Sequence, residues 1–478
     1  MNINTYDFSQ NNIAVVGFGR TGKSLLDFLL VQTNYKSLAL FNDTPCESPE
    51  DKRFMQVYRG CGVNFIIGPE QFHQLENMDL ILLSPGVDAR KPRFQPLREK
   101  RIRIISEIEF AASFIKAPII AVTGTNGKST TVSLIHHFLV KNGIKSFLTG
   151  NIGYPLISKV KNIRDNDVVV LEVSSFQLEE IERFKPYIAL ILNVTPDHLD
   201  RYKDLDDYYA AKLNIGSNQD LRDYKILNAD DPVLRQKVAA ELPVFGKKVW
   251  FSRLSQDVGT GAYLEGNNIR IRLPGVDESV SLAKNPLKGV HNLENLLAAV
   301  LAARLAGVPA AGIETAVEDF KGLPHRMESV GTIGKVEFIN DSKATNVDAA
   351  LKSIAGMDRP LVLILGGKDK GGDFTLLRDA VKEKVSHVLL VGAAARTIHE
   401  QLKDIEKHCL FSYVGDFAEA VARGYELLKD EEQGGVVLLA PGCASFDMFR
   451  NFEHRGQVFK DEVLRLMSDV REKGNRNG

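Results

Sequence analysis

A glycine-rich segment in the first third of the chain carries the clearest chemical signal. Residues 121–131 read AVTGTNGKSTT between a predicted strand and a predicted helix, and glycines in such a turn let backbone N–H groups face a phosphate. Lys128 can then reach the β- and γ-phosphates of a nucleotide, and the hydroxyl that follows it can bind Mg²⁺. The strict phosphate-loop pattern requires glycine at position 122, which is Val122 here, but GTNGKST is far more demanding than a glycine-rich turn. The segment therefore predicts ATP binding by Gly124, Thr125, Asn126, Gly127, Lys128, Ser129 and Thr130.

A second glycine-rich turn, GFGRTG at residues 17–22, follows the first predicted strand. Asp43 comes about twenty residues later, at the end of the second predicted strand, which is the spacing of a dinucleotide-binding fold. That pattern makes a nicotinamide-dependent oxidoreductase one possible function. The same glycines serve the phosphates of any nucleotide, so a nucleotide-linked sugar fits the loop equally well. Arg20 and the turn Ser84-Pro85-Gly86 would line the same edge of the sheet.

Glu172, His198 and Lys212 are the strongest candidates for metal and acid–base chemistry. Glu172 ends the buried run VVVLE, where a carboxylate without a partner is costly unless it shares a Mg²⁺ ion with ATP. The alternative is a structural glutamate that caps the next helix through the following serine pair. His198 in NVTPDHLDR would be structural by itself, but it follows a strand at the same predicted edge as Lys128. Lys212 lies on a predicted helix, and a solvated lysine is the simplest interpretation.

The bulk composition excludes several classes of protein. The chain has 478 residues, a formal net charge of −1, 44% hydrophobic residues and 25% charged residues. That charge balance argues against a general binder of nucleic acid or of anionic membranes. Four scattered cysteines without a CxxC pair indicate neither a disulfide framework nor a zinc site, and the polar N-terminus and short apolar runs resemble neither a signal peptide nor a membrane span. We therefore expect a cytoplasmic protein that binds no nucleic acid and does not insert into a membrane. A monomer is a separate expectation, because nothing in the composition indicates the oligomeric state.

Short apolar runs alternate with polar turns and helical stretches, which is the rhythm of parallel βα units. We predict an α/β fold of three domains: a Rossmann-like N-terminal domain (residues 1–106), a central domain like a P-loop ATPase (107–322) and a Rossmann-like C-terminal domain (323–478). Residues 247–290 predict a small antiparallel excursion, and HNLENLLAAVLAARLAG predicts a long helix that stops at Gly307. Nearly every polar cluster follows the C-terminal end of a predicted strand, where open parallel sheets bind ligands.

Seven motifs, in order along the chain, resemble those of the Mur ligases of peptidoglycan synthesis. They are GTNGKST, LEVSSFQL, NVTPDHLDR, YYAAKLNI, HNLENLLAA, GLPHRME and NDSKATN, and they span all three predicted domains. NDSKATN at residues 340–346 and GCASFDMFRNFEHRG near the C-terminus most resemble the branch of the family that adds D-glutamate. A set that covers the whole chain is much more specific than any single motif.

The resemblance implies an ATP-dependent, amide-bond-forming ligase that first phosphorylates a carboxylate. It implies UDP-N-acetylmuramoyl-L-alanine and D-glutamate as substrates, with a UDP-sugar-binding first domain, an ATP-binding second domain and an amino-acid-binding third domain. It also implies ATP and two Mg²⁺ ions as cofactors. Lys212 matches a lysine that family members carry as a carbamate, an anion able to bind Mg²⁺.

The functional positions of the family carry over onto matching residues of this chain. Those implied in catalysis are Lys128, Glu172, His198 and Lys212, and those implied at the metal ions are Ser129, Glu172, His198 and Lys212. Besides the phosphate loop, ATP would contact Asn292, Asn295, Arg326 and Asp341. The substrates would contact Gly17, Arg20, Thr21, Asp43, Thr44, Gly86, Asn151, His198, Lys343, Thr345, Lys370, Ser445, Phe446 and Phe452. In this last set Gly17, Thr21, Asp43, Thr44 and Gly86 match the UDP-sugar site, while Arg20 departs from the family pattern, because some relatives carry an apolar residue there. Lys343, Thr345, Lys370, Ser445 and Phe452 match positions that receive D-glutamate, with Lys368 as the alternative to Lys370.

Three other functions stay open on the sequence. A sister ligase, including the folylpolyglutamate ligase, would share the phosphate loop but carry a different segment in place of NDSKATN. A nicotinamide oxidoreductase would not need ATP and would leave Lys128, Glu172 and His198 without a role. A nucleotide-gated binding protein without turnover would not need His198 or a carbamate.

Overall fold

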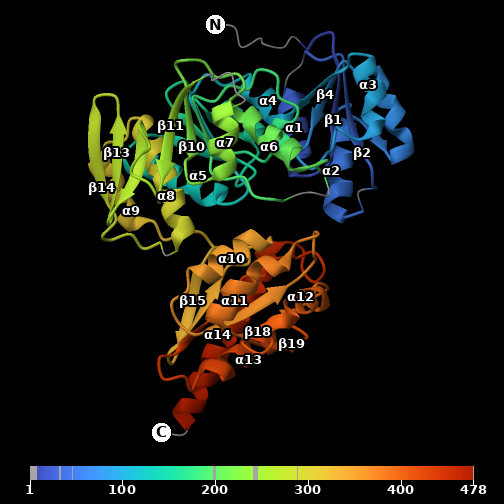
Figure 1. Cartoon of the computed structure of the whole chain (residues 1–478). Helices are drawn as coiled ribbons and strands as arrows, with labels where there is room; N and C mark the ends of the chain where they lie inside the picture. Colours follow the sequence, from blue (N-terminus) through green and yellow to red (C-terminus); the bar gives the residue numbers. More distant parts are fainter. Residues whose placement is uncertain are drawn as a thin grey trace. The chain divides into compact units, whose positions relative to one another are not determined.

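The computed structural model describes residues 8–31, 34–45, 47–197, 201–240, 246–287 and 289–476. The chain divides into two compact units. The first comprises Met1–Val194, Arg201–Ala283 and Asn295–Ala316, and the second comprises Thr195–Asp200, Lys284–Glu294 and Val317–Gly478. The first unit contains two β-sheets and the second contains one (Figure 1).

The first sheet has five parallel strands in the order β3-β2-β1-β4-β5. Its strands are β1 (Asn12–Val16), β2 (Ser37–Asn42), β3 (Asn64–Ile67), β4 (Leu80–Leu83) and β5 (Arg103–Ser106), with helices α1 (Arg20–Val31), α2 (Pro49–Gly60) and α3 (Gln95–Glu99). The strand order reverses between β1 and β4, and the C-terminal ends of two such strands form a ligand-binding crevice in open parallel sheets. GFGRTG follows β1 and Ser84-Pro85-Gly86 follows β4, so both predicted turns lie at this edge.

The second sheet has nine strands in the order β14-β13-β12-β11-β10-β9-β6-β8-β7. Its strands are β6 (Ile119–Thr123), β7 (Ser146–Gly150), β8 (Val168–Glu172), β9 (Ile188–Ile191), β10 (Tyr224–Asn228), β11 (Lys247–Ser252), β12 (Gly261–Glu265), β13 (Asn268–Leu273) and β14 (Val276–Ser281). Its helices are α5 (Lys128–Lys141), α6 (Leu205–Leu213), α7 (Pro232–Ala240), α8 (Val290–Leu305) and α9 (Ala310–Asp319). Strand β6 lies between β8 and β9, so the glycine-rich segment after β6 emerges from the middle of the parallel strands.

The predicted antiparallel excursion is confirmed for β12, β13 and β14, which pair antiparallel in sequence. It is wrong for β11, which pairs in parallel with both β10 and β12. The run KVWF at the centre of β11 is partly to fully buried, so this strand extends the parallel core instead of starting a separate hairpin.

The sheet of the second unit has six strands in the order β15-β16-β20-β17-β18-β19. Its strands are β15 (Glu328–Ile333), β16 (Val336–Asn340), β17 (Leu361–Gly366), β18 (Val385–Val391), β19 (Leu410–Tyr413) and β20 (Gly435–Leu439). Its helices are α10 (Val347–Ala355), α11 (Arg378–Lys384), α12 (Ala395–Leu402), α13 (Phe417–Leu428) and α14 (Phe452–Arg476). Only β15 pairs antiparallel with its neighbour in this sheet, and the other strands pair in parallel. The mostly parallel sheet and its helices confirm the third predicted α/β domain.

Burial of the strands and of α8 follows the apolar patterning. Every residue of β17 and β20 is buried, as expected for parallel strands covered on both faces. The residues from Leu296 to Ala303 on α8 are all fully buried, and the helix is followed by Gly307 at φ +96°. The predicted α/β fold and its three-domain architecture are confirmed, while the boundaries at residues 106 and 322 stay predictions.

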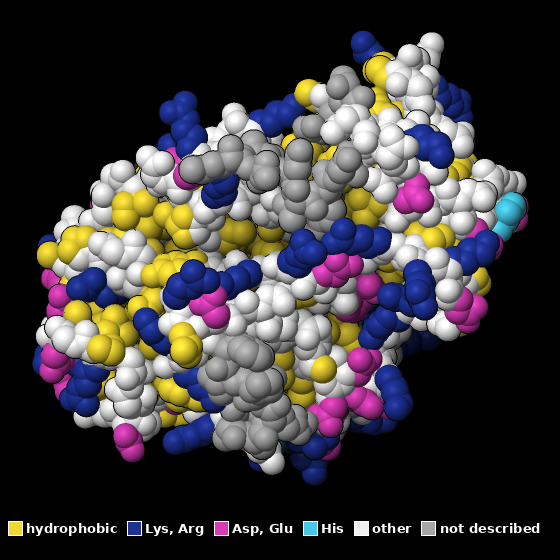
Figure 2. Space-filling view, turned by 90° about the horizontal axis from the view of Figure 1, so that it is seen from above, with side chains coloured by type: hydrophobic (Ala, Val, Ile, Leu, Met, Phe, Trp, Pro, Cys, Tyr) yellow, Lys and Arg dark blue, Asp and Glu magenta, His cyan; other side chains and the backbone are white. Residues whose placement is uncertain are grey.

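Charged side chains of both signs lie among one another on the face shown in Figure 2. This mixture agrees with the formal net charge of −1. In the described part of the chain, no helix has both the length and the apolar content that a membrane crossing needs.

Two buried glutamates on α4 (Glu107–Ala112) fasten the end of the first sheet to the second. The Glu109 carboxylate accepts hydrogen bonds from the N–H groups of Glu182, Arg183 and Phe184 at 2.7–3.0 Å. Glu107 accepts from the N–H of Ile157 at 2.7 Å. Burial raises the pKa of Glu107 to about 7, against the two backbone hydrogen bonds that lower it. Glu107 is therefore a buried carboxyl that prefers its neutral form.

We predict that Glu107→Gln stabilises the protein at pH 8 and much less at pH 5. The pKa of the Glu107 carboxyl is about 7 in the folded protein and 4.5 when the side chain is exposed. The neutral carboxyl therefore contributes its full stabilisation of the fold below pH 4.5, and this contribution is lost as the pH rises through about 7. At pH 8 the ionised side chain costs about 3 kcal/mol at most. Thermal melting at the two pH values checks this. Glu109→Gln is the matched control: it should lower the melting temperature at pH 8, because one of the two carboxylate oxygens that accept from these N–H groups becomes an NH2 group, which cannot accept.

Candidate active site

The glycine-rich segment after β6 is fixed by Asn193, which lies two residues after the neighbouring strand β9. The N–H of Asn126 donates to Asn193 Oδ1 at 2.9 Å, and Asn193 Nδ2 donates back to Asn126 O at 3.1 Å. Gly127 adopts φ +85° at the N-terminus of α5, a conformation that favours glycine. A 14-residue helix thus points its N-terminus at a preformed loop, as an anion-binding site requires.

Two lysine side chains converge on one carbonyl of this loop. Lys128 Nζ donates to Gly124 O and to Thr125 O, both at 2.8 Å. Lys212 Nζ on α6 donates to the same Gly124 O at 3.0 Å. Lys212 is 2% exposed, so the interpretation of a solvated helix lysine is wrong. Because α6 packs its lysine under the phosphate loop, Lys212 belongs to the candidate site.

Tyr208 ties the same helix to the loop a second time. Its hydroxyl forms a hydrogen bond of 3.1 Å with Thr125 Oγ1, and Lys212 Nζ lies 4.5 Å from the centroid of its ring. One turn of α6 therefore fixes both side chains against the loop.

Glu172 lies at the end of β8, which pairs with β6, and its two carboxylate oxygens differ in their hydrogen bonding. Its Oε1 accepts from Asn151 Nδ2 at 2.9 Å. Its Oε2 is buried and has no hydrogen-bond partner among the described residues. The interpretation of Glu172 as a helix cap is wrong, because Gln177 Oε1 accepts from the N–H of Ser174 in its place. A buried carboxylate oxygen without a partner fits a site that receives a cation.

The remaining predicted metal and adenine ligands differ in how far they can be placed. His198 lies outside the described residues. Among the described residues, no group of three His, Cys, Asp or Glu side chains forms a ready metal cluster. Asn292 and Asn295 lie on α8 and are both buried, and Asn295 Oδ1 accepts from Thr131 Oγ1 at 3.3 Å. Ser129 and Thr130 are buried in the first turn of α5.

The predicted UDP-sugar residues lie around the crevice of the first sheet. Ser84 Oγ donates to Gly17 O at 3.1 Å, which brings the loops after β1 and β4 together. Asp43 forms a two-pronged ion pair with Arg93, and this hydrogen bonding lowers the pKa of the Asp43 carboxyl. Sequence reasoning missed Arg93, which lies fifty positions away from its partner. The other predicted residues at this edge are the exposed Arg20, Thr44 and Gly86 and the half-buried Thr21.

The predicted residues of the second unit gather at the ends of β16 and β20. Asp341 is buried and accepts from the Ser353 hydroxyl and from the N–H of Met327. Burial raises its pKa, against the hydrogen bond from Ser353 and the charge of Arg326. Lys343 Nζ lies 3.8 Å from the centroid of the Phe452 ring. The other predicted contacts of this unit are Thr345, the exposed Lys370, the buried Ser445 and the exposed Phe446.

Arg455 on α14 is a functional candidate that sequence reasoning missed. It is 2% exposed, and its guanidinium donates to Ser342 Oγ and Ser342 O at 3.0 and 2.8 Å and to Cys443 O at 3.0 Å. Burial lowers its pKa to about 10. It therefore fastens the loop after β16, which carries Lys343, to the loop after β20, which carries Ser445. Arg455 lies in the motif GCASFDMFRNFEHRG, but nothing in that motif indicates which residues the arginine would contact.

Close relatives of this chain decide its family. The UDP-N-acetylmuramoylalanine–D-glutamate ligase of Thermoanaerobacter sp. (strain X514) is 42% identical over 422 residues, which is 87% of this chain and 90% of the relative. The ligase of the same name from Koribacter versatilis (strain Ellin345) is 40% identical over 469 residues, 98% of this chain and 100% of the relative. The chain belongs to the Mur ligase family. The family models "Mur ligase MurD-like, N-terminal domain", "Mur ligase middle domain" and "Mur ligase, glutamate ligase domain" match residues 11–106, 122–303 and 325–443.

Solved structures of Mur ligases share the fold. MurC of Thermotoga maritima has a TM-score of 0.56 at 19% identity and covers 96% of this chain and 100% of its own. MurF of Thermotoga maritima in complex with ADP has a TM-score of 0.56 at 16% identity and covers 97% of each chain. As a Mur ligase, the protein is an ATP-dependent, amide-bond-forming enzyme of peptidoglycan-precursor synthesis. Family membership leaves no support for an oxidoreductase or for a binding protein without turnover.

We predict that Gly127→Ala weakens binding of ADP by about 10-fold or more. An alanine Cβ at this position would lie 2.2 Å from Asn295 Oδ1. The alanine would also strain a backbone conformation that favours glycine. Gly143→Ala is the matched control at the other end of α5: its φ is +77°, and its Cβ would meet open space. That variant should lose about 1 kcal/mol of stability from backbone strain and keep its ADP affinity. Isothermal titration of both variants checks this, and equal affinities would contradict it.

Proposed function

We propose that this Mur ligase joins D-glutamate to UDP-N-acetylmuramoyl-L-alanine with hydrolysis of ATP to ADP and phosphate. The main support is the match, over nearly the whole chain, to ligases named for that product, together with a preformed phosphate loop beside the unpartnered Glu172 Oε2. We further propose that it acts in the cytoplasm as a monomer.

The chemistry explains why these groups stand together. A carboxylate is a poor electrophile, so the substrate carboxylate first attacks the γ-phosphorus of ATP, ADP leaves, and an acyl phosphate forms. The amine of D-glutamate then attacks the acyl carbon, phosphate leaves, and the amide bond is made. Two anions must meet in line in the first step, so the protein contributes chiefly by positioning and by charge neutralisation. Lys128, whose Nζ donates to the Gly124 carbonyl of the phosphate loop, would supply positive charge for that purpose.

The cation site is proposed around Glu172. Bound Mg²⁺ would neutralise the phosphates and the carboxylate, with Ser129, Glu172, His198 and a carbamylated Lys212 as its proposed ligands at two ions. Lys212 would react with CO₂ through its neutral amine, losing a proton to become a carbamate. Its nitrogen lies at the same carbonyl as Lys128 Nζ, where an anion would be better placed than a second cation.

The organic substrates are proposed to divide between the sheets. The UDP-sugar would lie along Gly17, Arg20, Thr21, Asp43, Thr44 and Gly86, with its carboxylate end near Asn151. ATP would also contact Asn292, Asn295, Arg326 and Asp341. D-Glutamate brings two carboxylates that need cationic or hydroxyl partners, which Lys343, Lys370, Thr345 and Ser445 would provide, with Phe446 and Phe452 beside them.

We predict that the purified protein releases phosphate only when ATP, Mg²⁺, UDP-N-acetylmuramoyl-L-alanine and D-glutamate are all present. The measurement is coupled phosphate detection with a panel of amino acids that includes L-glutamate, D-alanine and a diamino acid. A preference for another amino acid would assign a sister activity. No phosphate release with D-glutamate would refute the proposed substrate pair.

We predict that Glu172→Gln lowers turnover by about 100-fold or more, because it removes the negative charge proposed to hold Mg²⁺. The variant should also lose the rise in melting temperature that Mg²⁺ and ADP give the wild type together. Its melting temperature without ligand should not fall, since Glu172 Oε2 has no hydrogen bond to lose within the part of the chain that the structure describes. Glu182→Gln, which alters an ion-paired glutamate on the surface, should keep both properties. A Glu172→Gln variant with wild-type turnover would disprove the assignment.

A further inference from the structure

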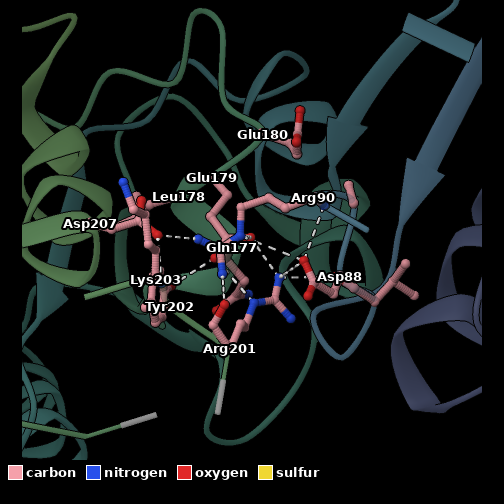
Figure 3. A network of polar contacts seen from close by, with 12 residues as sticks. Asp88, Arg90, Gln177, Leu178, Glu179, Glu180, Arg201, Tyr202, Lys203 and Asp207 are labelled. Carbon is pink, nitrogen blue, oxygen red and sulfur yellow. Dashed lines mark hydrogen bonds and ion pairs between the residues drawn. The ribbon is translucent and has the colours of Figure 1, made fainter. Parts of the chain in front are cut away.

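A set of charged side chains connects the loop after β4 to the segment that leads into α6 through ion pairs (Figure 3). We call Asp88, Arg90, Glu179, Arg201 and Asp207 the bridging network. Asp88 and Arg90 lie in the loop after β4 of the first sheet. Glu179 and Arg201 lie in loops of the second sheet, and Asp207 lies on its helix α6. All five lie in the first compact unit.

Arg201 forms the buried part of the bridging network. Its Nη2 donates to Glu179 Oε2 at 2.6 Å and its Nε donates to Oε1 at 3.2 Å. The same Nη2 donates to the carbonyl of Val87 at 3.2 Å. The side chains of Arg201 and Glu179 are 10% and 7% exposed, so this pair is shielded from the screening that weakens surface ion pairs. One guanidinium thus holds a backbone carbonyl of the loop that follows β4.

Arg90 forms the second part, and it reaches in the opposite direction. Its Nη1 donates to Asp207 Oδ2 at 2.7 Å and its Nη2 donates to the carbonyl of Arg201 at 2.5 Å. The guanidinium also lies 4.4 Å from the centroid of the Tyr202 ring. Burial by itself would lower the pKa of Arg90, but the carboxylates of Glu179, Asp207 and Asp88 raise it above its ordinary value. Arg90 therefore stays charged and binds both the segment before α6, at the Arg201 carbonyl, and the first turn of α6, at Asp207.

The bridging network is connected at one end to the loop after β1 and at the other end to the phosphate loop. On the first sheet, the loop that carries Val87 and Arg90 begins at Ser84, whose hydroxyl donates to Gly17 O. On the second sheet, Asp207 lies in the first turn of α6. The next residue on α6, Tyr208, contacts Thr125 of the phosphate loop, and one turn later Lys212 contacts Gly124.

We propose that Arg90 and Arg201 are positioning residues of the ligation reaction, which hold the UDP-sugar loop in register with α6 and the phosphate loop. This inference rests on the proposed function. Phosphoryl transfer to a carboxylate requires the attacking oxygen to lie in line with the γ-phosphate, and a displacement of about 1 Å is enough to slow such a step by about 100-fold. The two reactants bind on different sheets, so their alignment depends on the contacts that fix one loop against the other.

Another ion pair joins the same two sheets and provides a matched control. Arg103 pairs with Glu182, and their side chains are 32% and 41% exposed. Arg103 begins β5 and so lies at the opposite end of that strand from the ligand-binding edge. Arg103→Met removes an arginine that links the sheets but does not touch the alignment of the reacting groups.

The experiment compares Arg90→Met, Arg201→Met and Arg103→Met in the full chain, with melting temperature, kcat and the KM of each substrate measured. We expect the first two to lower kcat by about 10- to 100-fold and to leave the KM of ATP within about 2-fold of wild type. Arg103→Met should keep kcat, whatever its melting temperature. Arg90→Lys, which keeps one charge for Asp207, should recover part of kcat.

The outcomes separate this inference from the function on which it rests. Wild-type protein that releases no phosphate with D-glutamate refutes the proposed function, and this inference with it, before any variant is compared. With an active wild type, unchanged kcat in Arg90→Met and Arg201→Met overturns the positioning role. An equal fall of kcat in Arg103→Met also overturns it, because the effect would then belong to adhesion between the sheets. A loss of kcat restricted to Arg90 and Arg201, at a melting temperature like that of Arg103→Met, supports it.

Discussion

The rest of the active site depends on the carbonyl oxygen of Gly124, which accepts hydrogen bonds from both Lys128 and Lys212. A backbone carbonyl supplies only a partial negative charge, and two ammonium groups at one oxygen repel each other. A nearby negative charge or a neutral amine relieves that repulsion. The strand that ends in Glu172, the helix that carries the buried Lys212 and the loop fixed by Asn193 all place groups around the phosphate loop that contains this carbonyl.

Two kinds of contact connect that centre to the first sheet, and they differ in what they fix. The buried carboxylate of Glu109 accepts hydrogen bonds from the N–H groups of residues 182–184 and so joins the sheets through the main chain. The bridging network joins them through side chains at the edge where the loops carry polar groups. The first contact explains why the two sheets form one compact unit. The second explains how loops that are remote in sequence keep a defined distance from each other.

Local patterns predicted the parts of the structure that local physics determines. Apolar runs predicted the buried strands, GTNGKST predicted the phosphate loop, and VVVLE predicted a carboxylate at the end of a strand. Short strands such as β19, whose residues are partly exposed, lack that pattern and were not predicted. Arg93 with Asp43, Arg90 with Asp207 and Arg455 with Ser342 were also missed, since each pair is separated by fifty or more positions. An arginine on a helix gives no sign of the partner that the tertiary fold brings to it.

Among the described residues, Arg455 donates mainly to main-chain oxygens, and the hydroxyl of Ser342 is its one side-chain partner in a hydrogen bond. Main-chain oxygens are present whatever residue occupies a position. The side chains at the tips of these two loops can therefore be exchanged during evolution while the frame that presents them is kept. If these two loops receive the amino acid, as proposed above, a change of the accepted amino acid does not require a new scaffold.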